Sequence, residues 1–397
     1  MPPYRTRPER RLTIGPASAV LTAIQPAKPL RIAIVTEFYY PHLGGVCEHV
    51  HYFAREARGL GHHVDIITSN MPGAVPEANV MRMGQSRTIF INGSLARVSM
   101  GFGLRKRMRE TLRAGGYDVV HVHSPLTPRL PLLAVEEAEA PLVGTFHTYF
   151  DRSFAYRIGR PYFRSRLRKI DAPIAVSPAA VEAFERYFHA DWRIIPNGID
   201  IHEFSPHQPC PPEIDKSVPT ILYLGRLDPR NGLRLLITAF RRMRARGTQA
   251  RLVVVGGGPL SNYYRQLANG DPDIVFTGSV ANRAAYYANS TIYACPTSRG
   301  ASFGITLLEA MACETPIVCT YIPGFRDVVK HEREALMVPR EDEAALARAL
   351  ERLLDDETLR ARMGRAGRET AIRYNWTSVT QEVLAVYASV IARRSQG

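Results

Sequence analysis

Short apolar runs alternate with longer amphipathic segments along most of the chain. In the first half the apolar runs are rich in β-branched residues, which predicts strands. These predicted strands cover residues 31–36, 64–68, 118–122, 142–146 and 173–176. Helix-length segments lie between them, among them Val46–Leu60, closed by Gly61, and Pro178–Phe188. This alternation is typical of a parallel sheet covered by helices on both faces.

The same alternation begins again after a proline-rich segment. The predicted strands of the second half cover residues 220–224, 251–255, 274–276, 292–294 and 316–318. Asp200–Pro219 contains five prolines, a density that regular elements do not tolerate, so we expect a linker there. Three helical patterns, at about residues 343–354, 356–372 and 375–393, end the chain. We therefore predict two Rossmann-like, doubly wound α/β domains with the ligand site in the cleft between them.

These patterns suggest the following domain boundaries. Residues 1–29 are a basic, proline-containing leader that we expect to be disordered. The first domain covers residues 30–200 and is joined by the C-terminal helix 375–393, because a break at Tyr374–Trp376 precedes that helix. Residues 201–219 form the linker, and residues 220–374 form the second domain.

Composition supports a two-domain globular protein and adds a prediction about its location. A chain of 397 residues, 45% hydrophobic and 22% charged, is long for a single core. No apolar run approaches the roughly 18 residues of a membrane-spanning helix. The five cysteines lack CxxC spacing, so neither a zinc site nor a disulfide framework is implied, and a cytoplasmic location fits.

The formal net charge of +14 favours an anionic partner, and the basic residues are clustered in the first half. Leu104, Met108 and Leu112 recur every four residues, which predicts an apolar helical stripe. Basic residues edge this stripe, namely Arg105, Lys106, Arg109 and Arg113. One interpretation is peripheral binding to an anionic membrane on the inner face of the cell, with a lipid acceptor. The alternative is a core-facing stripe with a solvated basic rim. The chain carries no nucleic-acid signature, so we do not expect a nucleic-acid partner.

Three stretches carry candidate chemistry. Gly44 and Gly45 follow the first strand and precede a helix, where the backbone could approach an anion such as a diphosphate. Arg226 follows the first strand of the second half and would suit a diphosphate clamp, because its guanidinium is always charged. A later helix begins near Gly304 and carries Glu309, whose carboxylate could hold ribose hydroxyls or serve only as a helix-dipole or salt-bridge partner.

The stretches around these residues resemble a known enzyme family. GRLDPRNGL (225–233) and ASFGITLLEAMACETP (301–316) are similar to the donor-site signatures of the large retaining glycosyltransferase family that uses nucleotide sugars, family 4 or group 1. IPNGID (195–200) and YNW (374–376) also match, so the resemblance covers about residues 30–393. It implies the GT-B fold. INGSLAR (91–97) and GTFHTYF (144–150) narrow the resemblance to bacterial phosphatidylinositol mannosyltransferases, which implies mannose as the sugar and a phosphatidylinositol-type acceptor.

The resemblance also implies roles for individual residues. Gly44 and Gly45 would lie beside the donor diphosphate, Arg226 would bind it, and Glu309 would bind the nucleotide ribose. The other residues implied in donor binding are Asn231, Val280, Gly304, Ile305 and Thr306. His147 would lie at the reacting centre, although a strand-end histidine is also a common structural residue. The implied reaction uses no metal or other cofactor. The leaving phosphate takes the acceptor's proton on the same face, so the anomeric configuration is retained.

Three positions depart from the family's pattern. Asn231 stands where the family usually has lysine, Ala301 where it usually has glutamate, and Glu314 where it usually has a small residue. Asn231 removes a positive charge from the diphosphate clamp, and Ala301 removes an acceptor for the sugar's hydroxyl groups. An alternative function is therefore a catalytically impaired relative that acts as a binding or scaffolding protein. A sugar-phosphate epimerase on the same fold is less consistent with Arg226, Glu309 and IPNGID.

Overall fold

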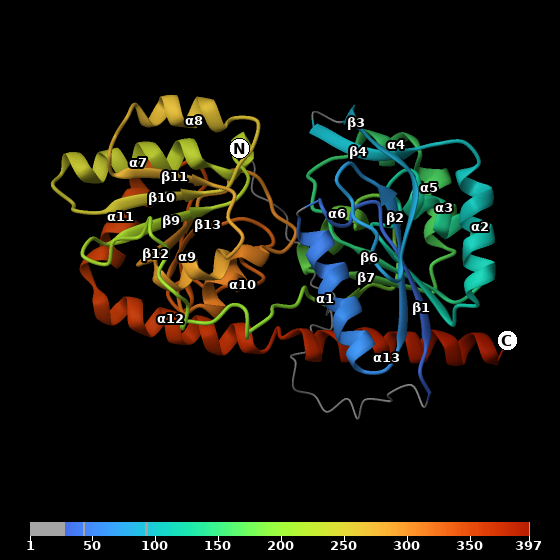
Figure 1. The fold of residues 1–397 in the computed structure, drawn as a ribbon. Coiled ribbons are helices and arrows are strands. Elements are labelled where there is room, and N and C mark those ends of the chain that lie inside the picture. The colour runs from blue at the N-terminus through green and yellow to red at the C-terminus, as the bar shows by residue number, and fades with distance from the viewer. Residues whose placement is uncertain (1–27, 43, 92–93, 397) are drawn as a thin grey trace, which may run out of the picture.

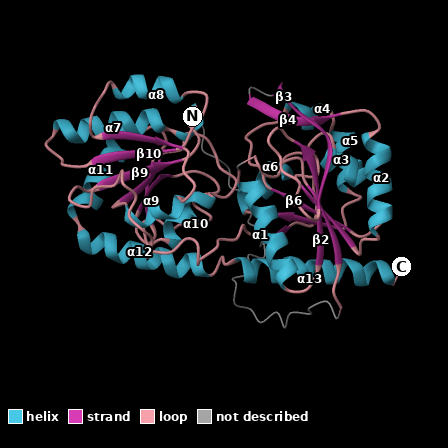
Figure 2. Cartoon of the chain, viewed as in Figure 1, coloured by secondary structure: helices cyan, strands magenta, loops and turns pink. Residues whose placement is uncertain are grey.

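The computed structural model describes residues 28–396 except residues 43, 92 and 93, so residues 1–27 of the predicted basic leader lie outside the described part. Two sheets, each flanked by helices, form two halves that lie side by side (Figures 1 and 2). Apart from one antiparallel pair, neighbouring strands in both sheets run parallel. The predicted α/β class with two doubly wound units is confirmed.

The first sheet has the strand order β4-β3-β2-β1-β5-β6-β7-β8 in the described residues. Its strands are β1 (Arg31–Val35), β2 (His63–Asn70), β3 (Val80–Ile91), β4 (Ser94–Met100), β5 (Val119–His123), β6 (Leu142–Phe146), β7 (Ala172–Ala175) and β8 (Arg193–Ile194). Its helices are α1 (Gly45–Gly59), α2 (Leu104–Gly115), α3 (Leu130–Glu137), α4 (Phe154–Ile158), α5 (Arg160–Leu167) and α6 (Pro178–Glu185). Strands β1 and β5–β7 are buried almost throughout, which explains their continuous apolar character.

Strands β3 and β4 were not predicted from the sequence. They pair antiparallel at the edge of the first sheet, and β3 adds to β2 in parallel. Polar residues such as Arg82 and Gln85 interrupt the apolar pattern of β3. β4 is the edge strand and β3 lies between it and β2. Most described side chains of β3 are partly or fully exposed, so its sequence lacks the apolar run that marks the central strands.

The second sheet has the order β11-β10-β9-β12-β13-β14 in the described residues. Its strands are β9 (Thr220–Leu224), β10 (Arg251–Val255), β11 (Ile274–Gly278), β12 (Ile292–Cys295), β13 (Ile317–Thr320) and β14 (Ala335–Val338). Its helices are the short 3₁₀ helix η1 (Pro229–Asn231), α7 (Leu233–Ala245), α8 (Ser261–Ala268), α9 (Arg283–Asn289), α10 (Ile305–Ala312), α11 (Glu343–Asp355) and α12 (Glu357–Ile372). Two apolar clusters pack on the two faces of this sheet.

The last helix, α13 (Trp376–Ser395), returns to the first half. It runs beneath that half, whereas α12 lies beneath the second (Figure 1). Trp376, Leu384 and Tyr387 of α13 are buried in one core cluster with residues of α1 and β1. The segment after β8 packs closely against the start of α13, because a Cβ atom on Gly198 would lie 2.4 Å from the Trp376 ring. Among the described helices, none is both long and apolar enough to cross a bilayer.

Candidate functional site

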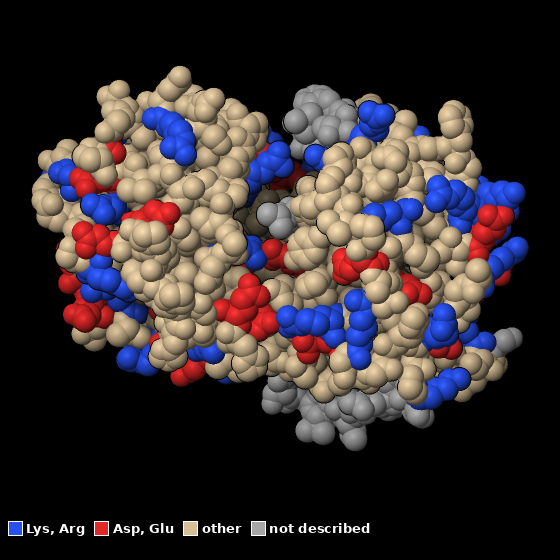
Figure 3. Space-filling view, in the orientation of Figure 1, with Lys and Arg blue, Asp and Glu red and all other residues tan. Residues whose placement is uncertain are grey.

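A cleft of about 1140 Å³ separates the two halves. In the space-filling view it is a hollow with basic side chains at its upper rim (Figure 3). Residues just beyond the carboxyl ends of central strands line it, as in other doubly wound sheets. Ser124 follows β5, His147 follows β6, and Gly225 follows β9. Two parallel sheets therefore present their carboxyl ends to one shared space.

Most of the residues predicted for the site line this cleft. The lining includes Gly45, His147, Arg226, Asn231, Gly304, Ile305 and Thr306. Gly44, Val280 and Glu309 are not among the lining residues. Val280 packs, partly buried, against the core of the second half. The structure thus brings Gly45 of the first half and Arg226 of the second, both predicted to lie at the diphosphate, to one cleft. Glu309 lies outside its lining.

Two helices begin at the cleft with glycine residues. Gly44 precedes α1 and Gly304 precedes α10, and neither helix start has a side-chain cap. A Cβ atom on Gly45 would have no neighbour within 4 Å, so the space in front of this glycine is open. Gly304 has a φ of 89°, and a Cβ atom there would lie 2.7 Å from Phe325. Uncapped amides at helix starts favour anions, so both ends are suited to a phosphate.

Both halves contribute positive charge to the cleft, with Arg97 and Arg152 from the first half and further arginines from the second. The exposed arginines Arg226 and Arg299 both line it. Arg230 also lines it but pairs with Asp228 at 3.0 Å, which partly neutralises it. Asn231 donates a hydrogen bond from its amide to the backbone carbonyl of Arg226 at 2.8 Å. This hydrogen bond therefore stabilises the conformation of the segment that carries Arg226.

Glu309 is fully buried on α10. Its Oε2 accepts a hydrogen bond from the Tyr287 hydroxyl at 2.9 Å, and its Oε1 lies 3.2 Å from Arg283. Arg283 also contacts Glu48 of α1 at 2.8 Å, so it links the two halves. Burial raises the pKa of the Glu309 carboxyl, and the Arg283 charge opposes that rise. A ribose would therefore compete with the charge of Arg283 for Oε1, which makes no hydrogen bond to the described residues, because Oε2 is already bonded to Tyr287.

The other two positions at which the sequence predicted a departure, Ala301 and Glu314, have different settings. Ala301 lines the cleft, where its methyl group offers no hydrogen-bond acceptor. Glu314 is exposed at the far end of α10, outside the cleft lining, so it does not bring negative charge into the lining. Its φ of 58° lies in the left-handed region, which explains why a glycine suits this position better.

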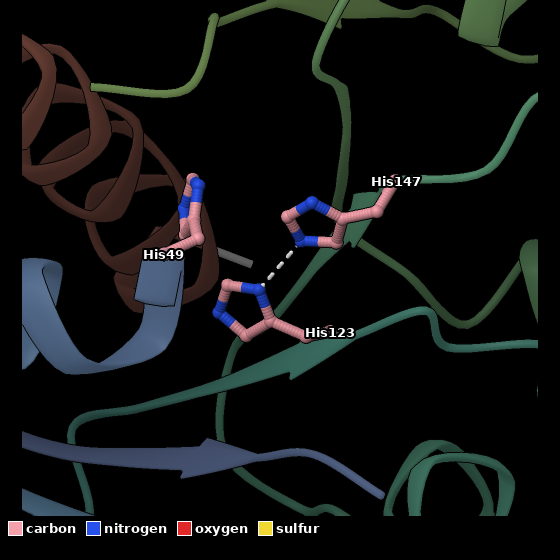
Figure 4. A group of neighbouring side chains, drawn as sticks. All are labelled: His49, His123 and His147. Carbon is pink, nitrogen blue, oxygen red and sulfur yellow. Dashed lines mark hydrogen bonds between the residues drawn. The ribbon is translucent and has the colours of Figure 1, made fainter. Parts of the chain in front are cut away.

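Four buried histidines lie together at the cleft, where His147 lines it and the other three lie beneath it. His121 and His123 come from β5, His147 follows β6, and His49 comes from α1; Figure 4 shows the last three together. His123 Nδ1 and His147 Nε2 are 2.8 Å apart. Burial lowers the pKa of His49 to about 4 and that of His121 to about 3, and it holds the pKa values of His123 and His147 well below the ordinary range. All four imidazoles are therefore neutral at pH 7.

Sequence reasoning missed several residues of the site. Arg299 lines the cleft from a loop without a spacing signal. Tyr149 lines it from the GTFHTYF stretch, where the resemblance pointed to His147 and not to the tyrosine. His121 and His123 could have been noticed, because two histidines two positions apart on a predicted strand share a face. His49 and Arg283 had no such signal, since each sits on a helix far from its partners in the sequence.

The apolar stripe of α2 faces the core. Leu104, Met108 and Leu112 are buried in the first half, so the membrane interpretation of this stripe is wrong and the core-facing alternative holds. The arginines beside it are paired with glutamates of the α3 region. Arg105 pairs with Glu136 and Glu137, Arg109 with Glu137, and Arg113 with Glu139. Lys106 remains exposed and lies 3.8 Å from Glu110 of its own helix.

Sequence profiles of two glycosyltransferase families match this chain. The profile for Glycosyltransferase Family 4 matches residues 43–203, and the profile for Glycosyl transferases group 1 matches residues 218–356. The phosphatidyl-myo-inositol mannosyltransferase of Mycolicibacterium smegmatis is 32% identical over 91% of this chain and 94% of its own length. The protein of the same name from Mycobacterium leprae is 33% identical over 92% of this chain and 99% of its own.

Solved structures share the fold. Sucrose-phosphate synthase from Thermosynechococcus elongatus matches with a TM-score of 0.72 and 21% identity, over 91% of this chain and 99% of its own. Anabaena Alr3699/HepE, solved with UDP-glucose, matches with a TM-score of 0.71 and 17% identity, over 91% of this chain and all of its own. The fold and the cleft therefore define a GT-B glycosyltransferase that uses a nucleotide-sugar donor. The chain belongs to glycosyltransferase family 4, group 1, as the sequence resemblance predicted.

The buried histidines predict how stability depends on pH. An unfolded histidine titrates near pH ~6.5, whereas the buried ones stay neutral, so the unfolded chain binds more protons below that pH. Stability is then lost as the pH falls, by about 1.4 kcal/mol at pH ~5.5 for each buried histidine. Urea unfolding at the two pH values ~7.5 and ~5.5 measures the difference.

The matched variants for this measurement are His121→Gln and His207→Gln. His121 is fully buried, so its replacement should shrink the pH difference by about 1.4 kcal/mol. His207 is exposed, so its replacement should leave the difference unchanged. An unchanged difference in His121→Gln would contradict the assignment of a neutral buried imidazole.

Proposed function

We propose that this enzyme transfers mannose from a nucleotide-sugar donor to a phosphatidylinositol-type lipid, with retention of configuration at the anomeric carbon. The observation that carries the proposal is the similarity to proteins named phosphatidyl-myo-inositol mannosyltransferase, which extends over 91% and 92% of this chain. A likeness over both halves includes the acceptor side as well as the donor side of the cleft. It therefore bears on the acceptor more directly than a match confined to the second half.

The chemistry of the cleft supports donor binding by charge and amides. Arg226 and Arg299 supply positive charge to a diphosphate, and the starts of α1 and α10 supply backbone amides. Such groups stabilise the negative charge that develops on a leaving diphosphate, each by roughly 3–4 kcal/mol in comparable sites. We therefore propose a transfer that needs no metal. The leaving phosphate accepts the proton of the attacking hydroxyl on the same face of the sugar.

The acceptor side of the cleft has an apolar border. Phe154 and Ile158 of α4 are each 64% exposed, and the adjacent Ser153 and Ala155 line the cleft. The guanidinium of Arg157 lies 5.5 Å from the centre of the Phe154 ring. Exposed apolar side chains beside basic ones suit the interface of an anionic membrane. We propose that acyl chains of the acceptor approach along α4 and that the enzyme acts peripherally on the cytoplasmic face of the membrane.

The second candidate function is a catalytically impaired binding or scaffolding protein. Two observations favour it: the Asn231 amide is engaged with the Arg226 carbonyl, and Ala301 offers the sugar no acceptor. An impaired relative would still bind a nucleotide sugar through Arg226 and the helix starts. Binding and turnover must therefore be measured separately.

The direct test incubates the full chain with GDP-mannose and vesicles that contain phosphatidylinositol, and it follows labelled mannose into the lipid phase. We expect transfer that stops when phosphatidylinositol is replaced by phosphatidylglycerol. A thermal-shift comparison of GDP-, UDP- and ADP-sugars measures binding independently of turnover. Binding without transfer to any lipid would favour the impaired alternative. The absence of both would refute the proposal.

Replacing Arg226 tests the diphosphate assignment. Arg226→Ala should weaken nucleotide-sugar binding by about 1.5–3 kcal/mol, because a charge-assisted contact to phosphate is lost. Isothermal titration calorimetry gives the affinity. The matched control is Arg234→Ala, an exposed arginine on α7 outside the cleft lining, which should bind normally. Equal affinities for the wild type and Arg226→Ala would place the diphosphate elsewhere.

Restoring the family's residues tests whether the departures limit the enzyme. The double change Asn231→Lys with Ala301→Glu returns a charge for the diphosphate and an acceptor for sugar hydroxyls, so it should raise the transfer rate. The two residues contact one bound donor, so their effects should not simply add. Adding Glu314→Gly should relieve the left-handed backbone without changing the rate, because Glu314 lies outside the cleft lining.

A wild-type enzyme that already turns over rapidly would show that the site is complete in its present form. A folded double variant that remains inert would show that these residues are not what limits transfer. The loss of the hydrogen bond from Asn231 to the Arg226 carbonyl is one cost of the change. Asn231→Ala is therefore the control for that lost bond alone.

A further inference from the structure

Two of the four buried histidines, His123 and His147, are hydrogen-bonded to each other. The geometry of this bond bears on which ring nitrogen of His147 carries its proton. His147 lines the cleft, and its Nε2 is turned inward to His123 Nδ1 at 2.8 Å. In Figure 4 the second ring nitrogen of His147 lies on the far side of its ring from His123. Only His147 of this pair can reach a ligand, because His123 is fully buried.

The sheet positions this pair rigidly. In the parallel register of β5 and β6, His123 lies opposite Thr145, and His147 follows two residues later. The rings of His123 and His147 are nearly parallel, with centres 5.1 Å apart. On its other side His123 packs against His121, whose two nitrogens are bonded to Tyr387 and Thr145 at 2.6 and 2.7 Å. His123 therefore has little freedom to turn its ring.

Each imidazole carries a single proton, since burial keeps all of them neutral at pH 7. One nitrogen of the bonded pair must then donate and the other must accept. If His147 Nε2 donated, the proton of His123 would sit on its Nε2. That atom is buried and has no hydrogen-bond partner. A buried N–H without an acceptor costs free energy. If Nε2 of His123 carries no proton, no buried donor is left without an acceptor.

We propose that His123 is a positioning residue that donates its Nδ1–H to His147 Nε2 and thereby fixes His147 as the tautomer with its proton on Nδ1. His147 then presents an N–H donor to the cleft. The inference rests on the proposed function only in placing His147 beside the reacting sugar. The tautomer itself follows from contacts within the protein.

This tautomer limits what His147 can do. An Nδ1–H donates to an oxygen, so His147 binds a hydroxyl of the sugar or an oxygen of the leaving phosphate. It does not take the proton of the acceptor hydroxyl, because its other nitrogen is already engaged with His123. In the transfer, the bond from the anomeric carbon to the phosphate oxygen breaks as the bond to the acceptor oxygen forms. The acceptor's proton passes to the phosphate oxygen, so no histidine changes its charge.

His49 lies beside this pair but makes no hydrogen bond to it. Its Nδ1 lies 2.8 Å from Asn197 Oδ1, and its Nε2 has no partner. Ligand nitrogens of His49, His123 and His147 all lie within 4.8 Å of one another, a spacing at which a transition metal is the competing explanation. Two nitrogens bound to one tetrahedral zinc ion would be about 3.3 Å apart, given bonds of ~2.0–2.1 Å. The 2.8 Å separation of His123 and His147 is that of a hydrogen bond.

The test reads the tautomer directly in the full chain. Long-range ¹H–¹⁵N spectra of histidine-labelled protein distinguish Nδ1–H from Nε2–H, and His147→Asn identifies the signal. We expect His147 to be the Nδ1–H tautomer in the absence of any donor. An Nε2–H tautomer would overturn the proposal. This measurement needs no turnover, so it decides the inference even where transfer of mannose to phosphatidylinositol fails.

Two variants of His123 link the tautomer to catalysis. His123→Leu removes the donor, so His147 should shift toward Nε2–H, and kcat should fall by roughly tenfold or more while the KM for the donor changes little. His123→Asn places an amide N–H where Nδ1 was, so it should restore the tautomer and part of kcat. Melting temperatures show whether each variant folds. If His123→Leu does not fold, the wild-type spectrum and His123→Asn still decide the question.

Three results from measurements on variants would overturn the proposal. His147 could keep its tautomer in His123→Leu, or kcat could fall equally in the Leu and Asn variants while their tautomers differ. Elemental analysis of the purified full chain could also find a stoichiometric transition metal that is lost in His49→Leu, which would make the cluster a metal site. Recovery of both tautomer and kcat in His123→Asn would establish the positioning role.

Discussion

The cleft depends on how the chain closes back on its first half. Trp376, the first residue of α13, packs 5.1 Å from His49 and stacks on Tyr52 at 5.7 Å between ring centres. Its ring leaves no room for a side chain at Gly198, which lies where the chain leaves the first sheet. The segment that leaves the first half at Gly198 and the start of α13, which returns to it, therefore pack against each other. Both lie directly beside the buried histidines. This junction holds the carboxyl ends of both sheets toward one space.

A second link between the halves consists of charges. Arg283 lies between Glu48 of α1 and Glu309 of α10, and its side chain is only partly exposed. A buried carboxylate such as Glu309 is costly unless a cation compensates it, so Arg283 stabilises Glu309 as well as the interface. Glu309, which the family resemblance associates with the nucleotide ribose, thus shares its cation with Glu48 of the first half.

Polar groups beneath the cleft are organised differently from those at its surface. The exposed arginines of the cleft are positioned to attract an anion, whereas the histidines below them are neutral and hydrogen-bonded. Burial removes their charge, and directional hydrogen bonds fix their orientation. The site therefore combines a charged entrance for the donor with a neutral, rigid floor. Such a floor can present a hydrogen-bond donor without changing its protonation during the reaction.

The sequence by itself determined the two series of strands and helices, because the period of apolar residues is a local property that each segment carries. It also placed Gly45 and Arg226 after strands and Gly304 at the start of a helix, and parallel sheets bring the ends of their strands to one edge. Tertiary structure decided what local patterns leave open. An amphipathic stripe at Leu104–Leu112 shows that one face is covered but not what covers it, and the structure shows that the core of the protein does. The partners of Glu309 and the meeting of His49, His123 and His147 required the fold, because contacts between distant segments arise only when the sheets and α13 bring them together.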